Sequence, residues 1–483
     1  MLFNSYIFIL LFLPLCLIGY FTLNHFKKYS LGQLFLLGMS LWFYAYFNAR
    51  YLFIILASIL INYGAYLLIR RCRGTRRSKA VMIAGVAINV GILLYFKYMD
   101  FFIGNVNALF KTDFNLLNIL LPLGISFFTF QQISFIVDAY REEIPDYGFL
   151  HYASFVAYFP QLIAGPIVKH DELVPQFMDV DKKKFNADNF AQGIYIFTFG
   201  LAKKVLLADT FGSVVTYGFT TLNQLGSVSA LLVVLSYTIQ IYFDFSGYCD
   251  MAIGIGKMMN IDLPVNFNSP YKALTITEFW DRWHMTLTRF FTKYVYIPLG
   301  GNRKGKLRTY VNVLIVFLIS GFWHGASWNF VFWGLCHGVF VVITRAFKSF
   351  FDKLHPAFNW LITFAFVNIT WVFFRAETFS QALALLKALF SWNFTFDPLF
   401  MEMFRLAELK KLLAVFGIEA MYPPFLIMAF FLVAFVLILG CRNAYERMQR
   451  FKPTMLNLLT TIFLFTWCVF SFAGISTFLY FNF

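Results

Sequence analysis

Residues 311–346 read VNVLIVFLISGFWHGASWNFVFWGLCHGVFVVITRA. The segment contains two histidines, His324 and His337, with no acidic residue and a single arginine near its far end. About 20 apolar residues are enough for a helix to cross the hydrocarbon core of a bilayer. The segment therefore predicts helical structure within a membrane, with two ionisable rings inside it.

The rest of the chain has the same character. Of its 483 residues, 60% are hydrophobic and 13% are charged, a composition that a soluble domain of this length does not carry. We therefore predict an all-α integral membrane protein with roughly ten to twelve spans, some of them short or re-entrant. The other long apolar runs are 2–24, 31–47 with 51–69, 80–98, 117–137, 228–256, 358–373, 425–441 and 454–475.

The net charge of +15 is concentrated in four basic loops, at residues 70–79, 181–185, 302–308 and 441–452. The positive-inside rule predicts that these loops face the cytoplasm and its anionic lipid headgroups. We expect the lipid bilayer, and no nucleic acid, as the partner of this charge. A second interpretation is that some of the cations dock a polyanionic cytoplasmic donor, such as a nucleotide-bearing coenzyme.

No linker, low-complexity segment or repeat divides the sequence, so residues 1–483 are predicted to form a single polytopic domain. Prolines and glycines interrupt the apolar pattern at 121–130, 159–170 and 296–305. Broken helices persist in a membrane where their backbone groups are buried in protein or line a wet cavity, which predicts a cavity in the middle of the chain. The six cysteines have no paired spacing and predict neither a disulfide framework nor a zinc site.

His284 lies in the segment FWDRWHMTLT, residues 279–288. If this segment is one continuous helix, Trp280 and Trp283 share a face with His284, while Asp281 and Arg289 lie on the opposite face. The pattern predicts an amphipathic segment whose imidazole points toward the protein. The alternative is a core histidine that donates to a backbone carbonyl.

His324 follows the apolar run 311–323. An ionisable group at such depth is costly and suggests function, because desolvation keeps the ring neutral and able to accept a proton, as a general base must. His337 would lie about 20 Å along a continuous helix from His324, so the two can share a site only if the helix breaks at Gly325 or Gly334. No histidines are spaced as metal ligands on one helix face, and no metal site is predicted.

Two acidic residues, Asp244 and Asp250, lie in the apolar segment YFDFSGYCD at 242–250. Carboxylates in such a context can belong to a proton relay or an ion site. They can equally pair with an arginine and hold helices together, and this structural interpretation is preferred.

Six stretches of the chain, taken together and in order, resemble the membrane-bound O-acyltransferase (MBOAT) family. Within it they are most similar to the bacterial alginate O-acetyltransferase-like branch, the membrane subunits that O-acetylate polysaccharide or peptidoglycan. The core motifs lie within residues 121–345. The stretches are 121–141, 158–176, 240–258, SPYKALTITEFWDRWHMTLTRFFTKYVYIPLGGNRKG at 269–305, LISGFWHGASWNFVFWGLCHG at 318–338 and FLYFNF at 478–483.

The resemblance implies a multi-span helical bundle with re-entrant or interfacial helices around a central tunnel. It assigns the catalytic histidine of the family to His324 and the second active-site position to His284. Supporting roles are expected for Trp283, Trp323, His337, Asp244 and Asp250, and donor binding for Arg282, Asn302 and Arg303.

The resemblance further implies an O-acetyltransferase of the bacterial cytoplasmic (inner) membrane. It would move acetyl from cytoplasmic acetyl-CoA, with no bound cofactor, toward hydroxyls of an exported or cell-wall polysaccharide, either alginate-like or peptidoglycan. A separate periplasmic or extracellular acetyltransferase partner would complete the transfer. His324 would be the base, while His284 would orient the thioester or stabilise developing charge. An acetyl-histidine relay is the other route.

Other functions are also compatible with the composition. Within the same family, the chain could be a D-alanyl transferase or a lipid acyltransferase. A transporter or flippase would also contain broken helices and buried acids, but it predicts inverted repeats with matched interruptions in two halves, and the sequence has neither.

Overall fold

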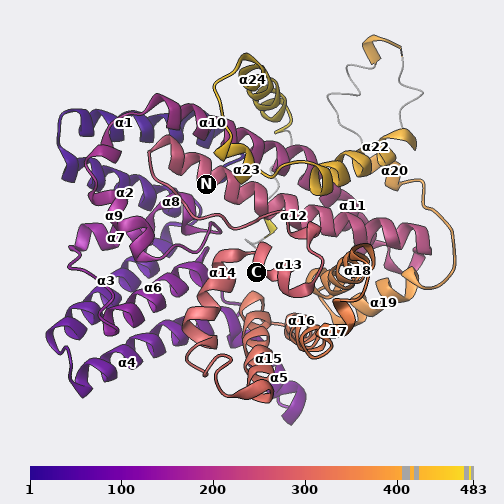
Figure 1. The fold of residues 1–483 in the computed structure, drawn as a ribbon, viewed down its shortest axis with the longest axis horizontal. Helices are drawn as coiled ribbons and strands as arrows, with labels where there is room; N and C mark the ends of the chain where they lie inside the picture. The colour runs from indigo at the N-terminus through magenta and orange to yellow at the C-terminus, as the bar shows by residue number, and fades with distance from the viewer. Residues whose placement is uncertain (405–413, 418–423, 473–477, 480–483) are drawn as a thin grey trace. The chain divides into compact units, whose positions relative to one another are not determined.

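The computed structural model (Figure 1) describes residues 1–404, 414–417, 424–472, 478 and 479. Within these ranges the chain is helical, and the only extended pairing is an isolated antiparallel bridge between Phe267 and Trp283. The prediction of an all-α protein is confirmed.

The helices form two compact units, residues 1–197 with 251–265 and residues 198–250 with 266–483. The prediction of a single functional domain stays a prediction.

Polar side chains connect the helices of the first unit. Asn62 on α3 and Asn89 on α4 exchange amide hydrogen bonds of 2.6 and 3.2 Å, and Gln132 on α6 donates to Ser58 on α3 over 3.2 Å. Such bonds join helices where lipid supplies no hydrophobic driving force. The elements are η1 (Phe8–Phe12), α1 (Leu13–His25), α2 (Tyr29–Ala45), α3 (Ala49–Arg71), α4 (Arg76–Leu93), η2 (Leu94–Tyr98), α5 (Met99–Phe110), α6 (Ile125–Tyr140), α7 (Phe149–Ala157), α8 (Phe159–Leu162), α9 (His170–Met178) and η3 (Asp181–Lys183).

The second unit contains all three histidines of interest. Two long helices, α10 (Ala187–Ala202) and α12 (Ser227–Met258), are shared between the units. The remaining elements are η4 (Lys203–Ala208), α11 (Asp209–Thr220), η5 (Leu222–Gln224), η6 (Pro270–Lys272), α13 (Ile276–Arg282), α14 (Met285–Phe291), η7 (Thr292–Tyr296), α15 (Gly305–His324), α16 (Trp328–Ala346), α17 (Lys348–Phe351), α18 (Pro356–Arg375), α19 (Phe379–Leu389), α20 (Phe400–Met403), α22 (Pro424–Phe435), η9 (Val436–Gly440), α23 (Ala444–Gln449) and α24 (Met455–Phe470).

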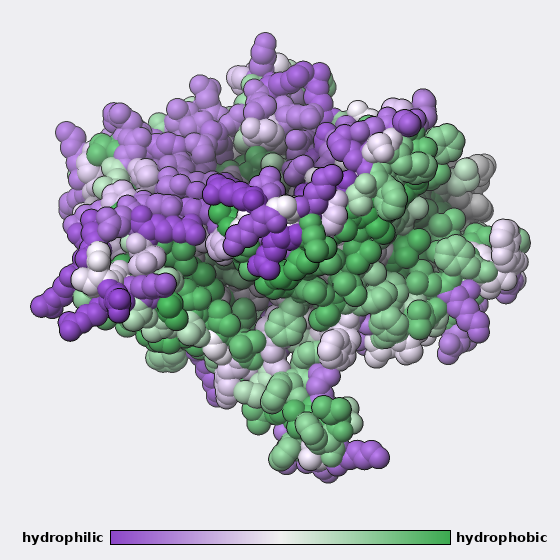
Figure 2. All heavy atoms as spheres, turned by 60° about the horizontal axis from the view of Figure 1, so that its bottom comes forward, coloured by the Kyte–Doolittle hydropathy of each residue, from purple (hydrophilic) through white to green (hydrophobic). Residues whose placement is uncertain are grey.

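Eight helices in the described part of the chain are long and apolar enough to cross a membrane, and three shorter apolar helices accompany them. The chain is therefore a multi-pass membrane protein. On the face drawn in Figure 2, hydrophobic side chains form broad continuous areas, as lipid-facing helices require. The predicted run 117–137 is helical only from Ile125, and the predicted runs 425–441 and 454–475 correspond to two of the shorter helices.

One long helix, Ala187–Thr220, was missed by the hydropathy pattern. It contains two successive lysines, which weaken its apolar signal. Lys203 Nζ lies 2.6 Å from Asp250, and Lys204 Nζ lies 2.7 Å from Asp244, both carboxylates being on α12. Lys204 and Asp244 are buried and Lys203 and Asp250 are partly buried, so these charges are paired, as a low-dielectric environment requires. The two acids do join helices, but their partners are lysines, not the arginine expected.

The hairpin of α15 and α16 depends on two glycines. A Cβ at Gly321 would overlap the backbone carbonyl of Phe330, and a Cβ at Gly334 would overlap that of Phe317. The two backbones can therefore approach only because both side chains are absent. The predicted break occurs at Gly325, where α15 ends, so the single run 311–346 forms two antiparallel helices.

Replacing Gly334 with alanine is expected to destabilise the protein by about 1–3 kcal/mol, because the added methyl overlaps backbone that must shift. Gly64, a helical glycine of α3 with nothing within 4 Å of its Cβ position, is the matched control. Gly64→Ala should be neutral or stabilising, since alanine favours helix by about 0.5–1 kcal/mol. Thermal unfolding in detergent measures both variants. Equal melting temperatures would contradict this account of the hairpin.

Candidate active site

His284 occupies a break between two short helices. α13 ends at Arg282, Trp283 is extended, and His284 adopts the left-handed conformation with φ 46° and ψ 50° before α14 begins. The predicted continuous helix through this segment is therefore wrong. Non-glycine residues held in sparsely populated backbone regions cost on the order of 1–3 kcal/mol and cluster at functional sites.

Residues 266–268 hold this break in place. Met285 N–H donates to the Asn266 carbonyl over 3.0 Å, and Asn268 N–H donates to the Arg282 carbonyl over 2.9 Å. Between these two bonds Phe267 pairs with Trp283. The backbone of His284 is thus fixed on both sides by a segment that precedes α13.

The Asn266 side chain determines which nitrogen of His284 carries the proton. Asn266 Oδ1 accepts from the Thr286 N–H over 3.2 Å, which identifies this atom as the oxygen, and it lies 3.1 Å from His284 Nδ1. His284 Nδ1 must therefore donate, so in the neutral ring Nε2 carries a lone pair. The side chain is fully buried, and burial lowers the pKa of His284 to about 3. The prediction that this ring points into the protein is confirmed.

The low pKa of His284 predicts an acid-sensitive fold. Below pH 6.5 the histidine of the unfolded chain gains a proton that the folded ring, with its pKa of about 3, does not take up. Stability therefore falls as the pH falls, by about 2 kcal/mol between pH 6.5 and 5 for this residue alone. His284→Asn should flatten this dependence, and asparagine tolerates the left-handed backbone. Melting temperatures measured from pH 7 to 5 test it, and parallel curves for the two proteins would refute it.

His324 is the last residue of α15 and is 2% exposed. Its ring packs edge-on against Trp333 on α16 and Phe374 on α18, with centroid separations of 5.1 and 5.2 Å. Trp323 lies 4.9 Å from the His324 ring and 6.2 Å from the His284 ring. The indole of Trp323 thus connects the two histidines across 40 residues of sequence.

His337 is bonded at both ring nitrogens. Trp280 Nε1–H donates to His337 Nδ1 over 3.2 Å, and His337 Nε2 lies 3.0 Å from Thr370 Oγ1. Because the Thr370 hydroxyl is also within reach of two backbone carbonyls of α18, its own proton goes there, and His337 Nε2–H donates to it. The ring therefore joins α13, α16 and α18, which suits a supporting role.

The three residues suggested for donor binding are not brought together with the histidines. Arg282 Nε and Nη2 contact Glu278 on the same helix at 3.0 and 2.8 Å. Asn302 and Arg303 are exposed in the loop before α15, and within the described part of the chain no contact joins either to the histidine cluster. Their role in donor binding stays a prediction.

A cavity of about 270 Å³ lies between α13, α14, α15 and α16. On α15 it is lined by Val313, Val316, Phe317 and Ser320, the spacing of a single helix face, on which His324 is the next position. On α16, His337 lies one turn before the lining residue Val341. His284 follows the lining residue Trp280 by four residues, but across the break after α13. The cavity lining therefore ends close in sequence to each histidine and includes none of the three.

Sequence reasoning missed Asn266 and Trp333. Asn266 precedes His284 by 18 residues, and only the chain reversal between them brings the two together. Trp333 follows the WHG stretch by eight residues, on the next helix, where it resembles an ordinary core aromatic. The one available signal was that both residues lie in or beside the motif-bearing stretches.

Comparisons with known proteins show the family of the chain. The sequence model described as MBOAT, membrane-bound O-acyltransferase family, matches residues 137–379, which include the three histidines. A peptidoglycan O-acetyltransferase of Helicobacter pylori is 46% identical, covering 81% of this chain and 80% of its own length. Proteins named "Probable alginate O-acetylase" from Pseudomonas aeruginosa and Pseudomonas putida are 38% and 40% identical, covering 89% and 81% of this chain and 81% of each of theirs. The chain therefore belongs to the MBOAT family and is a multi-pass membrane acyltransferase.

Proposed function

We propose that this acyltransferase moves an acetyl group from cytoplasmic acetyl-CoA across the bacterial cytoplasmic (inner) membrane to hydroxyls of an exported or cell-wall polysaccharide. Relatives that act on peptidoglycan and, by name, on alginate support both the O-acetyl chemistry and this acceptor class. The observation that carries the proposal is the pair of buried imidazoles, His284 and His324, which both pack against Trp323, with His324 continuing the α15 face that lines the cavity.

His324 is the general base in this proposal. It takes the proton of the acceptor hydroxyl as the hydroxyl oxygen attacks the thioester carbonyl, and the proton then passes to the departing thiolate. The C–O bond forms, the C–S bond breaks, and CoA leaves as the thiol. In the alternative route a His324 nitrogen attacks first, and the acetyl-histidine is then transferred to the hydroxyl.

The tautomer of His284 refines its expected role. A ring that donates at Nδ1 and stays neutral offers a lone pair at Nε2, so it accepts a hydrogen bond there and does not stabilise an oxyanion by donating. We assign His284 to orienting the substrate through an N–H or O–H group. Such positioning is worth several kcal/mol of the activation barrier.

Trp333 is our candidate for the oxyanion donor. Its indole is 1% exposed, packs edge-on against the His324 ring at 5.1 Å, and its Nε1–H has no hydrogen-bond partner among the described residues. A buried donor without a ground-state partner costs free energy. The Trp333 N–H would gain an acceptor when negative charge develops on the thioester carbonyl oxygen during transfer, and the transition state would be stabilised relative to the ground state.

The proposed topology places donor and acceptor on opposite sides. α15 begins within the basic segment 302–308, and its 20 residues rise about 30 Å, the thickness of a hydrocarbon core, to His324. The polar lining residues Thr292 and Arg345 of the cavity lie toward the basic-loop end, and Ser320 lies one turn from His324. In this proposal a thioester enters at the cytoplasmic end, and its carbonyl group reaches His324 beyond Ser320. A separate periplasmic or extracellular acetyltransferase partner then receives the acetyl group and delivers it to the polysaccharide.

The test compares acyl donors with purified protein in proteoliposomes. Acetyl-CoA added on the side of the 302–308 loop should release CoA when the partner acetyltransferase and a polysaccharide acceptor are inside. Palmitoyl-CoA should release at least about tenfold less, because its long chain would overfill a cavity of about 270 Å³. Preferred use of palmitoyl-CoA would replace the proposal with a lipid acyltransferase. No release with either donor would favour a D-alanyl transferase or a transporter. A D-alanyl donor is not favoured, because the relatives above act by name in O-acetylation.

A further inference from the structure

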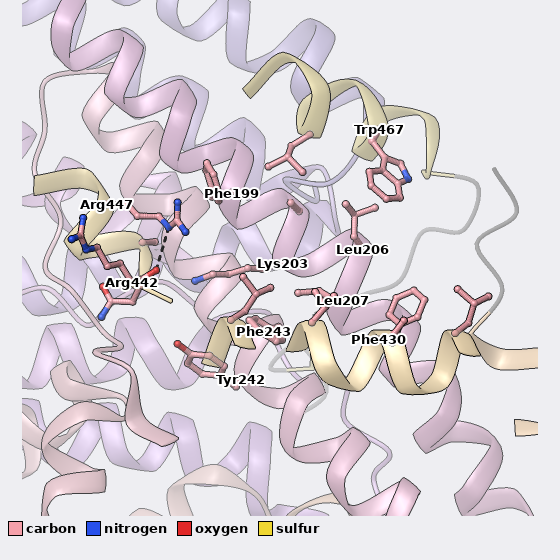
Figure 3. Close-up of a pocket in the computed structure, with 18 residues that line it drawn as sticks. Phe199, Lys203, Leu206, Leu207, Tyr242, Phe243, Phe430, Arg442, Arg447 and Trp467 are labelled. Atoms are coloured by element: carbon pink, nitrogen blue, oxygen red, sulfur yellow. Dashed lines mark hydrogen bonds between the residues drawn. The ribbon is translucent and has the colours of Figure 1, made fainter. Parts of the chain in front are cut away.

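A second cavity, of about 380 Å³, lies in the second unit away from the histidines. Its walls come from η4, α12, α22, η9 and α24, and most of them are aliphatic or aromatic (Figure 3). Phe430 on α22 and Leu464 and Trp467 on α24 form the apolar end. The volume falls in the range of small-molecule sites in proteins.

The other end of this cavity is cationic. Arg442 and Arg447, from the loop and short helix after η9, gather there with Lys203 (Figure 3). Lys203 is already paired with Asp250 at 2.6 Å. The two arginines have no ion-pair partner among the described residues. Arg447 donates from Nε to the Arg442 carbonyl over 3.2 Å, and its guanidinium lies 5.2 Å from the Phe199 ring centroid.

The net charge around this end is positive, as an anion-binding site requires. The Lys203–Asp250 pair is neutral as a unit, and among the described residues the other acid at this end is Glu446, on the same short helix as Arg447. Two guanidinium groups against one carboxylate leave a net positive end. An apolar slot that finishes in arginines matches a molecule with a hydrocarbon chain and an anionic headgroup.

A phospholipid matches both ends of the cavity, because its hydrocarbon chain suits the apolar wall and its anionic headgroup suits the two arginines. The apolar face of a transmembrane helix would offer the arginines no anion. The loop that supplies both arginines is also one of the four basic loops predicted to face the cytoplasm.

We propose that this cavity binds one acidic phospholipid of the cytoplasmic leaflet, with its phosphate between Arg442 and Arg447 and one acyl chain along the apolar wall. Basic pockets between membrane helices on the cytoplasmic side recognise such headgroups. The site is separate from the proposed acetyl transfer, and its occupation does not depend on that function.

Native mass spectrometry of the full-length protein tests the proposal. The protein is mixed with phosphatidylglycerol and phosphatidylethanolamine of identical acyl chains. The wild type should retain phosphatidylglycerol preferentially, and Arg442→Ala with Arg447→Ala should lower this preference by about tenfold or more, since each cation contributes about fivefold. Arg450→Ala removes an exposed charge at the end of the same helix and should leave the preference unchanged. Equal retention of the two lipids by the wild type would overturn the proposal.

A second pair of variants tests the apolar slot without changing charge. Ala429 lines the cavity, whereas its neighbour Met428 does not and is 73% exposed. Ala429→Trp should fill the slot and abolish lipid retention, and Met428→Trp should not. If Ala429→Trp retained phosphatidylglycerol but lost a co-purifying protein, the cavity would be a protein-docking site and the proposal would be wrong. Inorganic phosphate at millimolar concentration should not displace the lipid, and displacement would reduce the site to a simple anion site.

Discussion

Replacing His324 with alanine is expected to lower acetyl transfer by about 10²–10⁴-fold, the range that general acid–base catalysis contributes. The reason is the position of His324, which is buried and follows Ser320, the last α15 residue of the cavity lining, by one turn on the same helix face. Release of CoA thiol and transfer of labelled acetyl to polysaccharide measure the effect, with acetyl-CoA as donor.

The control for this variant must separate catalysis from folding. His25→Ala changes an exposed histidine at the end of α1 and should keep full activity. His324→Ala should retain the wild-type elution volume and a melting temperature within a few degrees, because Trp333 and Phe374 remain packed on each other at 5.1 Å. A folded His324→Ala protein that still transfers acetyl would exclude this ring as the base and as the relay.

Replacing His284 with alanine is expected to lower the rate of acetyl transfer by about a hundredfold, because a substrate displaced by about 1 Å reacts more slowly by about this factor. His284→Asn should retain roughly tenfold more activity than the alanine variant. The asparagine oxygen can still accept a hydrogen bond, and asparagine suits the backbone φ of 46°.

Asn266 provides an independent check on His284. Asn266→Leu keeps the imidazole but removes the oxygen that fixes its Nδ1 proton, so activity should fall by about 10- to 100-fold, the effect of losing a partner that orients a functional histidine. Asn266→Asp keeps an oxygen acceptor at the same place, and its activity should therefore be higher than that of Asn266→Leu. Wild-type activity in Asn266→Leu would show that the tautomer of His284 does not matter.

Much of the fold could be predicted from the sequence because lipid imposes a simple rule on apolar runs. The run 228–256 corresponds to α12, and the hairpin break at Gly325 was one of two anticipated positions. The helix Ala187–Thr220 was not predicted from hydropathy, because its two successive lysines lower the apolar character of the segment. Hydropathy counts each charge alone, whereas the folded protein pairs Lys203 with Asp250 and Lys204 with Asp244.

The site was predicted in part for a similar reason. Burial of His284 and His324 follows from their apolar neighbours and is confirmed. The left-handed turn at His284 could not be predicted, because it depends on pairing with residues 266–268. The donor chemistry and the catalytic roles stay predictions until the variants above are measured.

If His324 is the base proposed above, the aromatic packing around its ring has a consequence for the fate of the acyl group. The His324 ring is only 2% exposed, because it packs against Trp323, Trp333 and Phe374. Water, which would compete with a sugar hydroxyl for the acyl group, therefore has little room beside the ring. Excluding bulk water in this way suppresses wasteful hydrolysis of a reactive intermediate. An enzyme built like this should consume its thioester only when an alcohol is in place.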